Sequence, residues 1–272
     1  MSIHPLHGKI NIEHSYLTYL QDQFPINDET IRTAFHEQLF KKNTLAKGPY
    51  LEVAAPYVEG QTITQLIHEG ILNPKIAQLN QNELPADRPL FAHQEKAVRK
   101  AKKGHNFIVA TGTGSGKTES FMMPILNGLF EELSDGLLTP GVRALFLYPM
   151  NALANDQMKR LRSLLKDTPE ITFGRYTGDT QKTKKEAEDQ FKQQNLGEPI
   201  LSNEILSRDE MRHSPPHILV TNYAMLEYLL LRPEDTSFFD GPYARNWRYL
   251  VLDEVHTYNG ANGVEIGMLL RR

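Results

Sequence analysis

The chain has 272 residues, of which 40% are hydrophobic and 23% charged, so it can bury one sizeable core and a smaller one. Its formal net charge of −3 argues against binding to nucleic acid through a general positive field, so any such contact must be local. The absence of cysteine excludes disulfides, iron–sulfur clusters and cysteine-based zinc sites within this sequence. We find no secretory signal and no apolar run of membrane length, which indicates a cytoplasmic protein without a membrane partner.

Residues 1–87 carry no catalytic signature, and we expect them to form an N-terminal helical accessory region. Asn27 or Asp28 caps a predicted helix whose apolar residues recur at helical spacing. A second short helix is expected to close at Gly70. The polar stretch 80–87 contains a proline and marks the expected boundary with the next domain.

The most informative motif is the run T-G-T-G-S-G-K-T-E-S, which directly follows the apolar residues 107–110. We expect residues 107–110 to be a buried strand that leads into a turn and then a helix. Glycines in such a turn let backbone N–H groups wrap a polyphosphate, and the helix dipole adds to the attraction. Lys117 supplies a charge for the β- and γ-phosphates, and Thr118 supplies a hydroxyl for Mg²⁺. The predicted nucleotide-binding residues of this loop are Thr111, Gly112, Thr113, Gly114, Ser115, Gly116, Lys117, Thr118 and Glu119.

The first position of this loop departs from the strict form of the motif. Thr111 stands six residues before Lys117, where the strict pattern G-x-x-x-x-G-K-[ST] has a glycine. The match is therefore to a relaxed form of the phosphate-binding loop. The alternative is a flexible glycine loop that happens to contain Lys-Thr, and the expected strand before it and helix after it favour the phosphate loop.

A second apolar run ends in two acids at residues 250–254, with the sequence L-V-L-D-E. We predict that Asp253 holds Mg²⁺ and that Glu254 orients or deprotonates the attacking water. Taken alone, such a pair also fits a solvated turn or the start of a helix. The phosphate loop and the acidic pair complete one another's chemistry, so the sequence predicts an ATP-hydrolysing site that uses ATP and Mg²⁺.

From Arg88 onward, short apolar runs alternate with helical stretches, which predicts an α/β fold with a parallel sheet flanked by helices. The expected strands are residues 107–110, 144–148, 171–173, 218–221 and 249–252. The functional-looking clusters follow these strands, at the edge where open α/β sheets bind ligands. The charged stretch between Thr180 and Pro216 predicts a solvated helical insertion, with a nucleic-acid-binding arm as the alternative.

Five sequence blocks occur in an order that resembles the first RecA-like domain of superfamily 2 helicases of the DEAD/DEAH-box type, over about residues 88–272. The blocks are L-F-A-H-Q, the phosphate loop, Y-P-M-N-A-L-A-N-D-Q, Y-T-G-D together with V-T-N-Y, and D-E-V-H. The block after the expected strand 144–148 contains P-M-N-A-L-A, where DEAD-box RNA helicases have P-T-R-E-L-A. In the acidic box, His256 stands where those helicases have a final Asp. The chain thus looks like the YprA/MrfA-like DNA helicases, a branch with repair and antiphage-defence members. The resemblance implies single-stranded DNA, rather than RNA, as the substrate.

Further roles follow from this resemblance, position by position. Gln94 would contact the adenine edge, since an amide both donates and accepts, and Phe91 would stack nearby. His256 would link the nucleotide site to the strand-binding side and is counted with Lys117, Asp253 and Glu254 as catalytic. The residues implied to hold the sugar-phosphate backbone are Asn151, Thr177, Gly178, Thr221 and Asn222. Ordinary surface, turn, cap and packing roles are the alternatives for these residues.

The family places a Ser-Ala-Thr block and a second RecA-like domain after the acidic box, and residues 255–272 contain neither. We therefore expect an incomplete RecA-like domain from a longer ATP-dependent DNA helicase or translocase, nearly inactive in isolation, whose partner is that second domain. One alternative is a P-loop ATPase switch controlled by a protein partner, and another is a non-enzymatic tether. Stimulation of hydrolysis by single-stranded DNA distinguishes the motor from the switch.

Overall fold

The computed structural model describes residues 4–41, 46–48, 50, 56–112 and 114–272. The chain divides into two compact units, residues 1–56 and residues 57–272. Among the described residues, no helix has both the length and the apolar character needed to cross a membrane.

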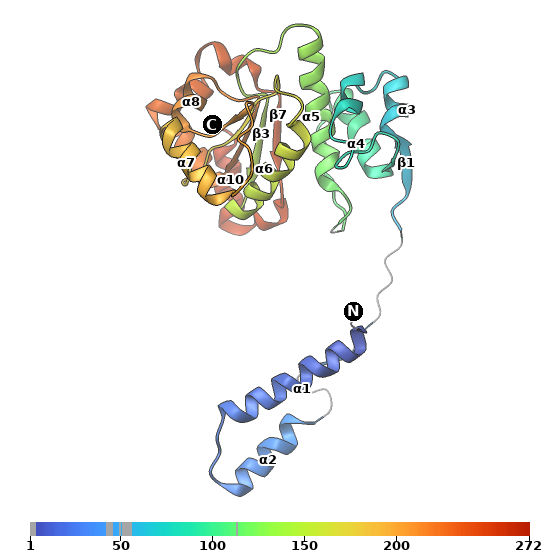
Figure 1. Cartoon of the computed structure of the whole chain (residues 1–272), viewed down its shortest axis with the longest axis vertical. Helices are drawn as coiled ribbons and strands as arrows, with labels where there is room; N and C mark the ends of the chain where they lie inside the picture. The colour runs from blue at the N-terminus through green and yellow to red at the C-terminus, as the bar shows by residue number, and fades with distance from the viewer. Residues whose placement is uncertain (1–3, 42–45, 49, 51–55, 113) are drawn as a thin grey trace. The chain divides into compact units, whose positions relative to one another are not determined.

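The described residues of the first unit form the helices α1 (Pro5–Gln23) and α2 (Glu29–Leu39) (Figure 1). The sequence prediction of a capped second helix is confirmed, because the Asp28 side chain accepts a hydrogen bond from the Ile31 N–H at 2.9 Å. The helix α1 had no clear sequence signal. Neither helix buries a residue, so this unit lacks a packed core of its own among its described residues.

The second unit is built on a five-stranded parallel sheet with the order β5-β4-β6-β3-β7. Its strands are β3 (Ala144–Tyr148), β4 (Phe173–Arg175), β5 (Glu204–Ile205), β6 (Ile218–Asn222) and β7 (Tyr249–Leu252). The central strand β3 is buried along its whole length, as expected for a strand covered on both faces. The predicted α/β class with a parallel sheet is confirmed, and β3 and β7 have the predicted bounds.

Helices cover both faces of this sheet and create two hydrophobic cores. The helices are α4 (Ala92–Lys102), α5 (Lys117–Ser134), α6 (Asn151–Leu165), α7 (Lys184–Gln194), α8 (Arg208–His213), α9 (Tyr223–Leu231) and α10 (Gly260–Leu269). Short 3₁₀ turns lie at Pro233–Phe238, Gly241–Asn246 and Val255–Thr257. The larger core joins α5 and α6 to Phe146 and Val220, and the smaller core joins α9 to Leu145 and Leu219.

The segment before α4 packs with the sheet unit rather than with α1 and α2. It contains β1 (Glu59–Thr62), α3 (Ile63–His68), a 3₁₀ turn (Pro74–Gln78) and β2 (Pro89–Phe91). The strand β1 pairs with β2 in antiparallel fashion, and the Asn73 N–H donates to the Asn127 side chain on α5 at 2.6 Å. These long-range contacts join residues 57–87 to the second unit, whereas the composition of the chain suggested a boundary near residue 87.

The strand predicted at residues 107–110 is wrong, because these residues have no regular secondary structure. A strand requires a neighbour that pairs with its backbone N–H and C=O groups. The edge strand β7 pairs only with β3 among the described residues, and Ile108 is 88% exposed. Residues 107–110 therefore lead into the loop as an irregular segment, and not as the buried strand that their apolar character predicted.

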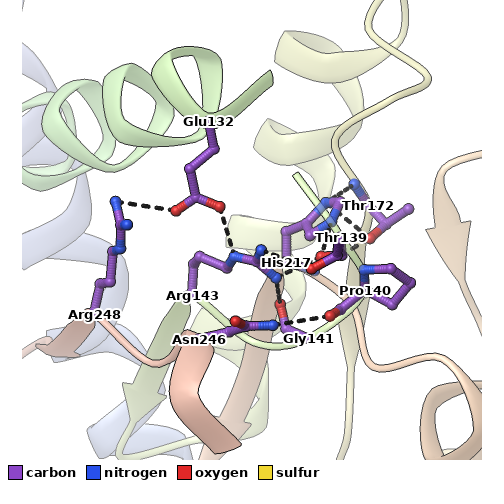
Figure 2. Close-up of polar contacts among 9 residues, drawn as sticks. All are labelled: Glu132, Thr139, Pro140, Gly141, Arg143, Thr172, His217, Asn246 and Arg248. Atoms are coloured by element: carbon purple, nitrogen blue, oxygen red, sulfur yellow. Dashed lines mark hydrogen bonds and ion pairs between the residues drawn. The ribbon is translucent and has the colours of Figure 1, made fainter. Parts of the chain in front are cut away.

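A polar cluster whose central residues Glu132, Arg143 and His217 are buried lies at the amino ends of the strands (Figure 2). We call it the strand-base cluster, and it comprises Glu132, Thr139, Gly141, Arg143, Thr172, His217, Asn246 and Arg248. The His217 Nδ1 atom accepts the Thr172 N–H at 2.9 Å, and His217 Nε2 lies 3.2 Å from the Thr139 carbonyl oxygen. Both contacts suit a neutral imidazole that donates through Nε2. Burial, and then the charge of Arg143, lower the pKa of His217 from 6.5 to about 4.

This lowered pKa predicts acid sensitivity of the fold. Because the unfolded chain takes up a proton near pH 6.5 and the folded one only near pH 4, stability contributed by neutral His217 is present above pH 6.5 and is lost as the pH falls toward 4. We expect the free energy of unfolding to decrease by up to roughly 1.4 kcal/mol per pH unit in this window from this residue alone. Urea unfolding at pH 7, 6 and 5 measures it.

The test compares the natural protein with His217→Gln, whose neutral amide can accept and donate at the same two positions. This variant should lose less stability between pH 7 and pH 5 than the natural protein. His105→Gln at an exposed position serves as the matched control. Equal acid sensitivity of His217→Gln and the natural protein would contradict the assignment.

Candidate nucleotide and nucleic-acid sites

The predicted phosphate loop joins the irregular segment after α4 to the first residue of α5. Gly114 and Gly116 have φ values of 73° and 68°, a region that favours glycine. Lys117 begins α5, and its ammonium group donates to the Thr111 carbonyl at 2.9 Å. The loop therefore closes on itself through this lysine and leads directly into a helix N-terminus. Thr113, also predicted to bind nucleotide, lies outside the described residues.

Gln94 fastens the phosphate loop to the helix α4. Its side-chain oxygen accepts the Phe91 N–H at 2.8 Å, and its side-chain nitrogen donates to the Gly116 carbonyl at 2.9 Å. His93 adds a contact of 2.9 Å between Nε2 and the Ser115 carbonyl oxygen. The structure thus brings the L-F-A-H-Q block against the loop, although Gln94 is only 3% exposed. Contact between Gln94 and an adenine stays a prediction.

Three aromatic rings gather beside the loop. Phe91 and His93 stack with centroids 5.7 Å apart, and the Tyr57 ring lies 5.1 Å from Phe91 and 5.8 Å from His93. A Cβ atom on Gly112 would lie 2.8 Å from the Tyr57 hydroxyl, so this glycine allows the close approach. Sequence reasoning selected Phe91 but missed the other two rings. His93 could have been found from its place between Phe91 and Gln94. Nothing in the sequence near Tyr57 indicates that its ring lies beside the loop.

The acidic box follows β7, at the same carboxyl edge of the sheet from which the other predicted contact loops leave. Asp253 accepts the Glu254 N–H through Oδ1 at 2.8 Å. Glu254 has φ = 49° and is the only described non-glycine residue with a positive φ, a conformation that costs energy and concentrates at functional sites. His256 Nδ1 lies 3.2 Å from Glu254 Oε2. The structure therefore brings the predicted acid pair and His256 into one turn.

Two buried phenol groups adjoin Asp253. Tyr148 is the last residue of β3 and lies beside Asp253, the residue that follows β7, because Leu147 pairs with Leu252. The Tyr148 and Tyr258 hydroxyls are buried without a hydrogen-bond partner among the described residues. Burial, followed by the charge of Asp253, raises the pKa of Tyr148 strongly and raises the pKa of Tyr258 to about 12. Both phenols are therefore protonated donors at neutral pH.

These orphaned groups make the acidic box suited to Mg²⁺ and its waters. Carboxylate and hydroxyl oxygens are the ligands that this hard cation prefers, and Asp253 with Thr118 supplies one of each. Mg²⁺ also keeps several waters, which need acceptors and donors around them. Unpartnered polar atoms rarely remain buried in proteins, so Tyr148 and Tyr258 beside Asp253 fit such a hydrated cation.

Glu119 connects the start of α5 to α6. One carboxylate oxygen pairs with the Arg160 guanidinium, and the other is buried without a partner. Glu119 also lies close to Gly116, where a Cβ would meet its Oε2 atom at 2.9 Å. This residue was predicted to bind nucleotide, and the structure places it beneath the phosphate loop.

Three polar side chains meet where β3, β4 and β6 end. The Asn222 amide donates to the Asn151 side-chain oxygen at 2.7 Å, and the Asn151 amide lies 3.4 Å from an Asp179 carboxylate oxygen. Asn222 also caps α9 by accepting the Met225 N–H at 2.8 Å. Asn151 and Asn222, predicted to contact a nucleic-acid backbone, are thus joined at this edge.

Of the other three predicted backbone contacts, the two threonines lie deeper and Gly178 is exposed. Thr221 and Thr177 are fully buried, and the Thr221 hydroxyl donates to the Tyr176 carbonyl at 2.6 Å. Arg208 donates to the carbonyls of Thr177 and Gly178 at 3.2 and 2.9 Å. In this arrangement Gly178 could contact a nucleic-acid backbone only through its own backbone groups. The two buried threonines instead stabilise the conformation of the loops around it. Sequence reasoning missed Arg208, which comes from the charged stretch before β6.

A cavity of about 190 Å³ adjoins this edge between α6, α7 and β4. Its cationic residues are Lys159, Arg162 and Arg175, and only Arg162 pairs with an acid there, Glu204, at 2.7 Å. Burial lowers the pKa of Arg175 below its ordinary value, and its side chain donates to Asn155. The cavity therefore adds a local positive charge to a chain of negative net charge.

Comparison with known families and proteins agrees with this geometry. The sequence model of the DEAD/DEAH box helicase family matches residues 91–272. The chain is 29% identical to the Druantia protein DruE of Escherichia coli (strain UMEA 4076-1), over 93% of this chain and 18% of DruE. It is also 29% identical to the uncharacterized ATP-dependent helicase YprA of Bacillus subtilis, over 67% of this chain and 20% of YprA. The chain thus spans about a fifth of the length of these relatives.

Solved structures show the same fold. The DUF1998 helicase MrfA bound to DNA and AMPPNP superposes with a TM-score of 0.57 at 24% identity, covering 80% of this chain and 25% of MrfA. A second structure of MrfA, bound to DNA, gives a TM-score of 0.55 at 26% identity and covers 74% of this chain and 24% of MrfA. The predicted RecA-like helicase fold is confirmed.

The phosphate loop predicts a specific sensitivity at Gly116. In Gly116→Ala the new Cβ would meet the Gln94 amide and Glu119, and φ = 68° would strain the backbone as well. We expect at least a roughly tenfold weaker affinity for ATP, since even 1.4 kcal/mol of strain in the bound loop has that effect. Gly136→Ala is the matched control, because Gly136 has φ = 69° but no atom within 4 Å of its Cβ position. Equal affinities of the two variants would contradict the assigned loop geometry.

Proposed function

The chain belongs to the DEAD/DEAH box helicase family, and from this premise we propose that it is the ATP-binding motor part of a DNA helicase or translocase. The observation that carries this proposal is the presence within one domain of a glycine loop, a helix N-terminus with Lys117 and Thr118, and the Asp253–Glu254 turn. These groups match the requirements of phosphoryl transfer, which are positioning and electrostatic stabilisation.

We assign roles to the groups of the nucleotide site as follows. Loop N–H groups and Lys117 hold the polyphosphate, and Thr118 with Asp253 would hold Mg²⁺. That cation supplies charge neutralisation on the phosphate oxygens when bound. Glu254 orients and deprotonates the attacking water, and His256 beside it couples this turn to the strand-binding edge. Phe91, His93 and Tyr57 offer an aromatic surface for the base.

We further propose that single-stranded DNA lies across the edge formed by Asn151, Asn222 and Gly178. Amides and backbone groups of this kind contact phosphates and sugars without reading sequence. The observation that supports DNA over RNA is the similarity to MrfA, whose structures contain DNA. The resemblance to repair and defence helicases suggests either pathway for the whole protein.

The second RecA-like domain of the natural protein is proposed to complete the catalytic site. In related nucleotide hydrolases an arginine from a neighbouring domain or protein stabilises the transferred phosphoryl group, with an effect of ~10³–10⁵ on the rate. Hydrolysis and unwinding are therefore properties to be measured on the complete natural protein.

The division of roles in the nucleotide site can be tested with three variants. Lys117→Ala should weaken ATP binding, because it removes the phosphate-facing charge. Glu254→Gln should keep binding and lower the hydrolysis rate roughly 10²–10⁴-fold, the usual contribution of general base catalysis. Asp253→Asn should chiefly raise the Mg²⁺ requirement. Equilibrium binding of a fluorescent ATP analogue and steady-state hydrolysis measure these effects, and equal loss of binding in Lys117→Ala and Glu254→Gln would refute the assignment.

The motor hypothesis also predicts modest, backbone-directed DNA binding. Each neutralised phosphate contributes a slope of about −0.7 to the logarithmic dependence of single-strand affinity on salt, so this part of the protein should account for only two or three phosphates. Oligonucleotides of different sequence should bind with similar affinity and should stimulate hydrolysis. Asn151→Ala and Asn222→Ala should each weaken the binding of all these oligonucleotides by the same factor. A hydrolysis rate that does not change when DNA is added would favour the alternative, an ATPase switch controlled by a protein partner.

A further inference from the structure

The helix α5 is anchored at its far end by a buried carboxylate. Glu132 lies near the end of α5 and accepts from Arg143 Nε at 2.9 Å, while its other oxygen lies 3.0 Å from Arg248 Nη1 (Figure 2). The Glu132 and Arg143 side chains are 8% and 3% exposed. Arg143 precedes β3 and Arg248 precedes β7, so one carboxylate ties α5 to the amino ends of two strands.

A second contact fixes the middle of α5 against β7. A Cβ atom on Gly128 would lie 2.6 Å from the Tyr249 hydroxyl, so the absence of a side chain permits the tyrosine to seat against the helix. Tyr249 is the first residue of β7 and packs against the larger core. Gly128 weakens a helix interior by roughly 1 kcal/mol relative to alanine, so its presence here needs the packing reason that Tyr249 provides.

These anchors set the level of the residues at the other end of α5 relative to the end of β7. Gly128 lies ten residues after Thr118, which corresponds to about 15 Å of helix. Tyr249 lies four residues before Asp253, which corresponds to about 13 Å of strand. Because α5 runs antiparallel to β7, the Gly128–Tyr249 contact brings Thr118 and Asp253 to nearly the same level. A slip of α5 by one residue would move Thr118 by about 1.5 Å relative to Asp253.

The remainder of the nucleotide site is bonded to α5 and α4 rather than to β7. Gln94 and His93 on α4 bond to the phosphate loop, and Lys102 on α4 pairs with Glu131 on α5. Figure 1 shows α5 between α4 and the strands β3 and β7. The site therefore has two parts, a loop part carried by α4 and α5 and an acidic part carried by β7.

We propose that Glu132, Arg143, Arg248, Gly128 and Tyr249 form a register lock that sets the two Mg²⁺-holding groups at their working separation. This inference rests on the proposed function, because Thr118 and Asp253 act together only in a nucleotide site. The five residues are positioning residues, since they touch neither the loop nor the acidic box. Loss of the lock displaces the metal groups from one another and leaves the nucleotide-binding loop intact.

The test measures binding of a fluorescent ATP analogue to the complete natural protein in Mg²⁺ and in EDTA, together with kcat and KM for ATP hydrolysis. The first variant is Arg248→Gln, chosen because the Arg248 side chain is 55% exposed and its loss leaves the Glu132–Arg143 pair in place. The second is Gly128→Ala, which forces α5 from Tyr249. In both variants we expect the affinity for the analogue in EDTA to stay within about twofold of that of the natural protein, since the loop part is unchanged. We expect kcat to fall roughly tenfold or more, because displacement of catalytic groups by an ångström or less lowers rates by such factors. The gain in affinity on adding Mg²⁺ should shrink in parallel.

Two further variants separate positioning from simple destabilisation. Gly128→Ala combined with Tyr249→Phe should recover the Mg²⁺ gain and kcat, because removal of the hydroxyl leaves the nearest ring atoms at an ordinary 3.5 Å. Glu131→Gln is the matched control, since it breaks the neighbouring ion pair of α5 to α4 and should leave the Mg²⁺ gain unchanged. Thermal unfolding of every variant is recorded alongside.

Three results would overturn the proposal. The first is an unchanged Mg²⁺ gain and kcat in both Arg248→Gln and Gly128→Ala. The second is equal loss of binding in EDTA and in Mg²⁺, which would mark the five residues as merely structural. The third is failure of Tyr249→Phe to restore Gly128→Ala. Absence of analogue binding by the unmodified protein is a separate outcome, which would refute the proposed function itself and the lock with it.

Discussion

The burial of α5 is the constraint on which the rest of the domain depends. From Glu119 to Phe130 almost every residue of this helix is buried, because α4 covers one side and the sheet covers the other. A helix that is buried on all sides has no solvent-facing freedom to rotate or slide without disturbing a core packed at crystal-like density. The first residue of this helix is Lys117, so the position of the phosphate loop is determined by contacts made several turns away.

The two ends of the sheet satisfy their polar groups in opposite ways. At the amino ends, Arg143 makes hydrogen bonds to Glu132, Thr139 and Gly141, so a buried charge is fully accommodated. At the carboxyl ends, hydroxyls of Tyr148 and Tyr258 stay buried without partners among the described residues. Saturated polar networks rigidify a fold, and orphaned groups mark places where ligands or waters complete it. The domain therefore has a rigid base beneath an edge arranged for binding.

Prediction from the sequence succeeded where the signal is local and failed where it depends on distant partners. The bounds of β3 and β7 followed from short apolar runs, and residue type predicted a cap at Asn27 or Asp28, of which Asp28 makes the bond. Residues 107–110 have the same apolar character, but a strand also needs a paired neighbour, which no local pattern encodes. The approach of Tyr57 to the loop and the pairing of β1 with β2 are likewise long-range. The contact of Gln94 with the Gly116 carbonyl is also long-range, and the sequence did not predict it, since the resemblance implied only a contact of Gln94 with adenine.

The relaxed first position of the phosphate loop illustrates why residue type must be judged by the conformation it adopts. Thr111 does not have a positive φ, so its backbone does not require glycine. Gly114 and Gly116 do have positive φ values. Its carbonyl accepts the Lys117 ammonium, a bond that any residue can supply. Its hydroxyl lies 2.5 Å from the Ser115 hydroxyl, a cross-loop bond that a glycine could not make. The loop does not need the conformational freedom of glycine at this position. Threonine instead supplies a hydrogen bond that holds the loop closed.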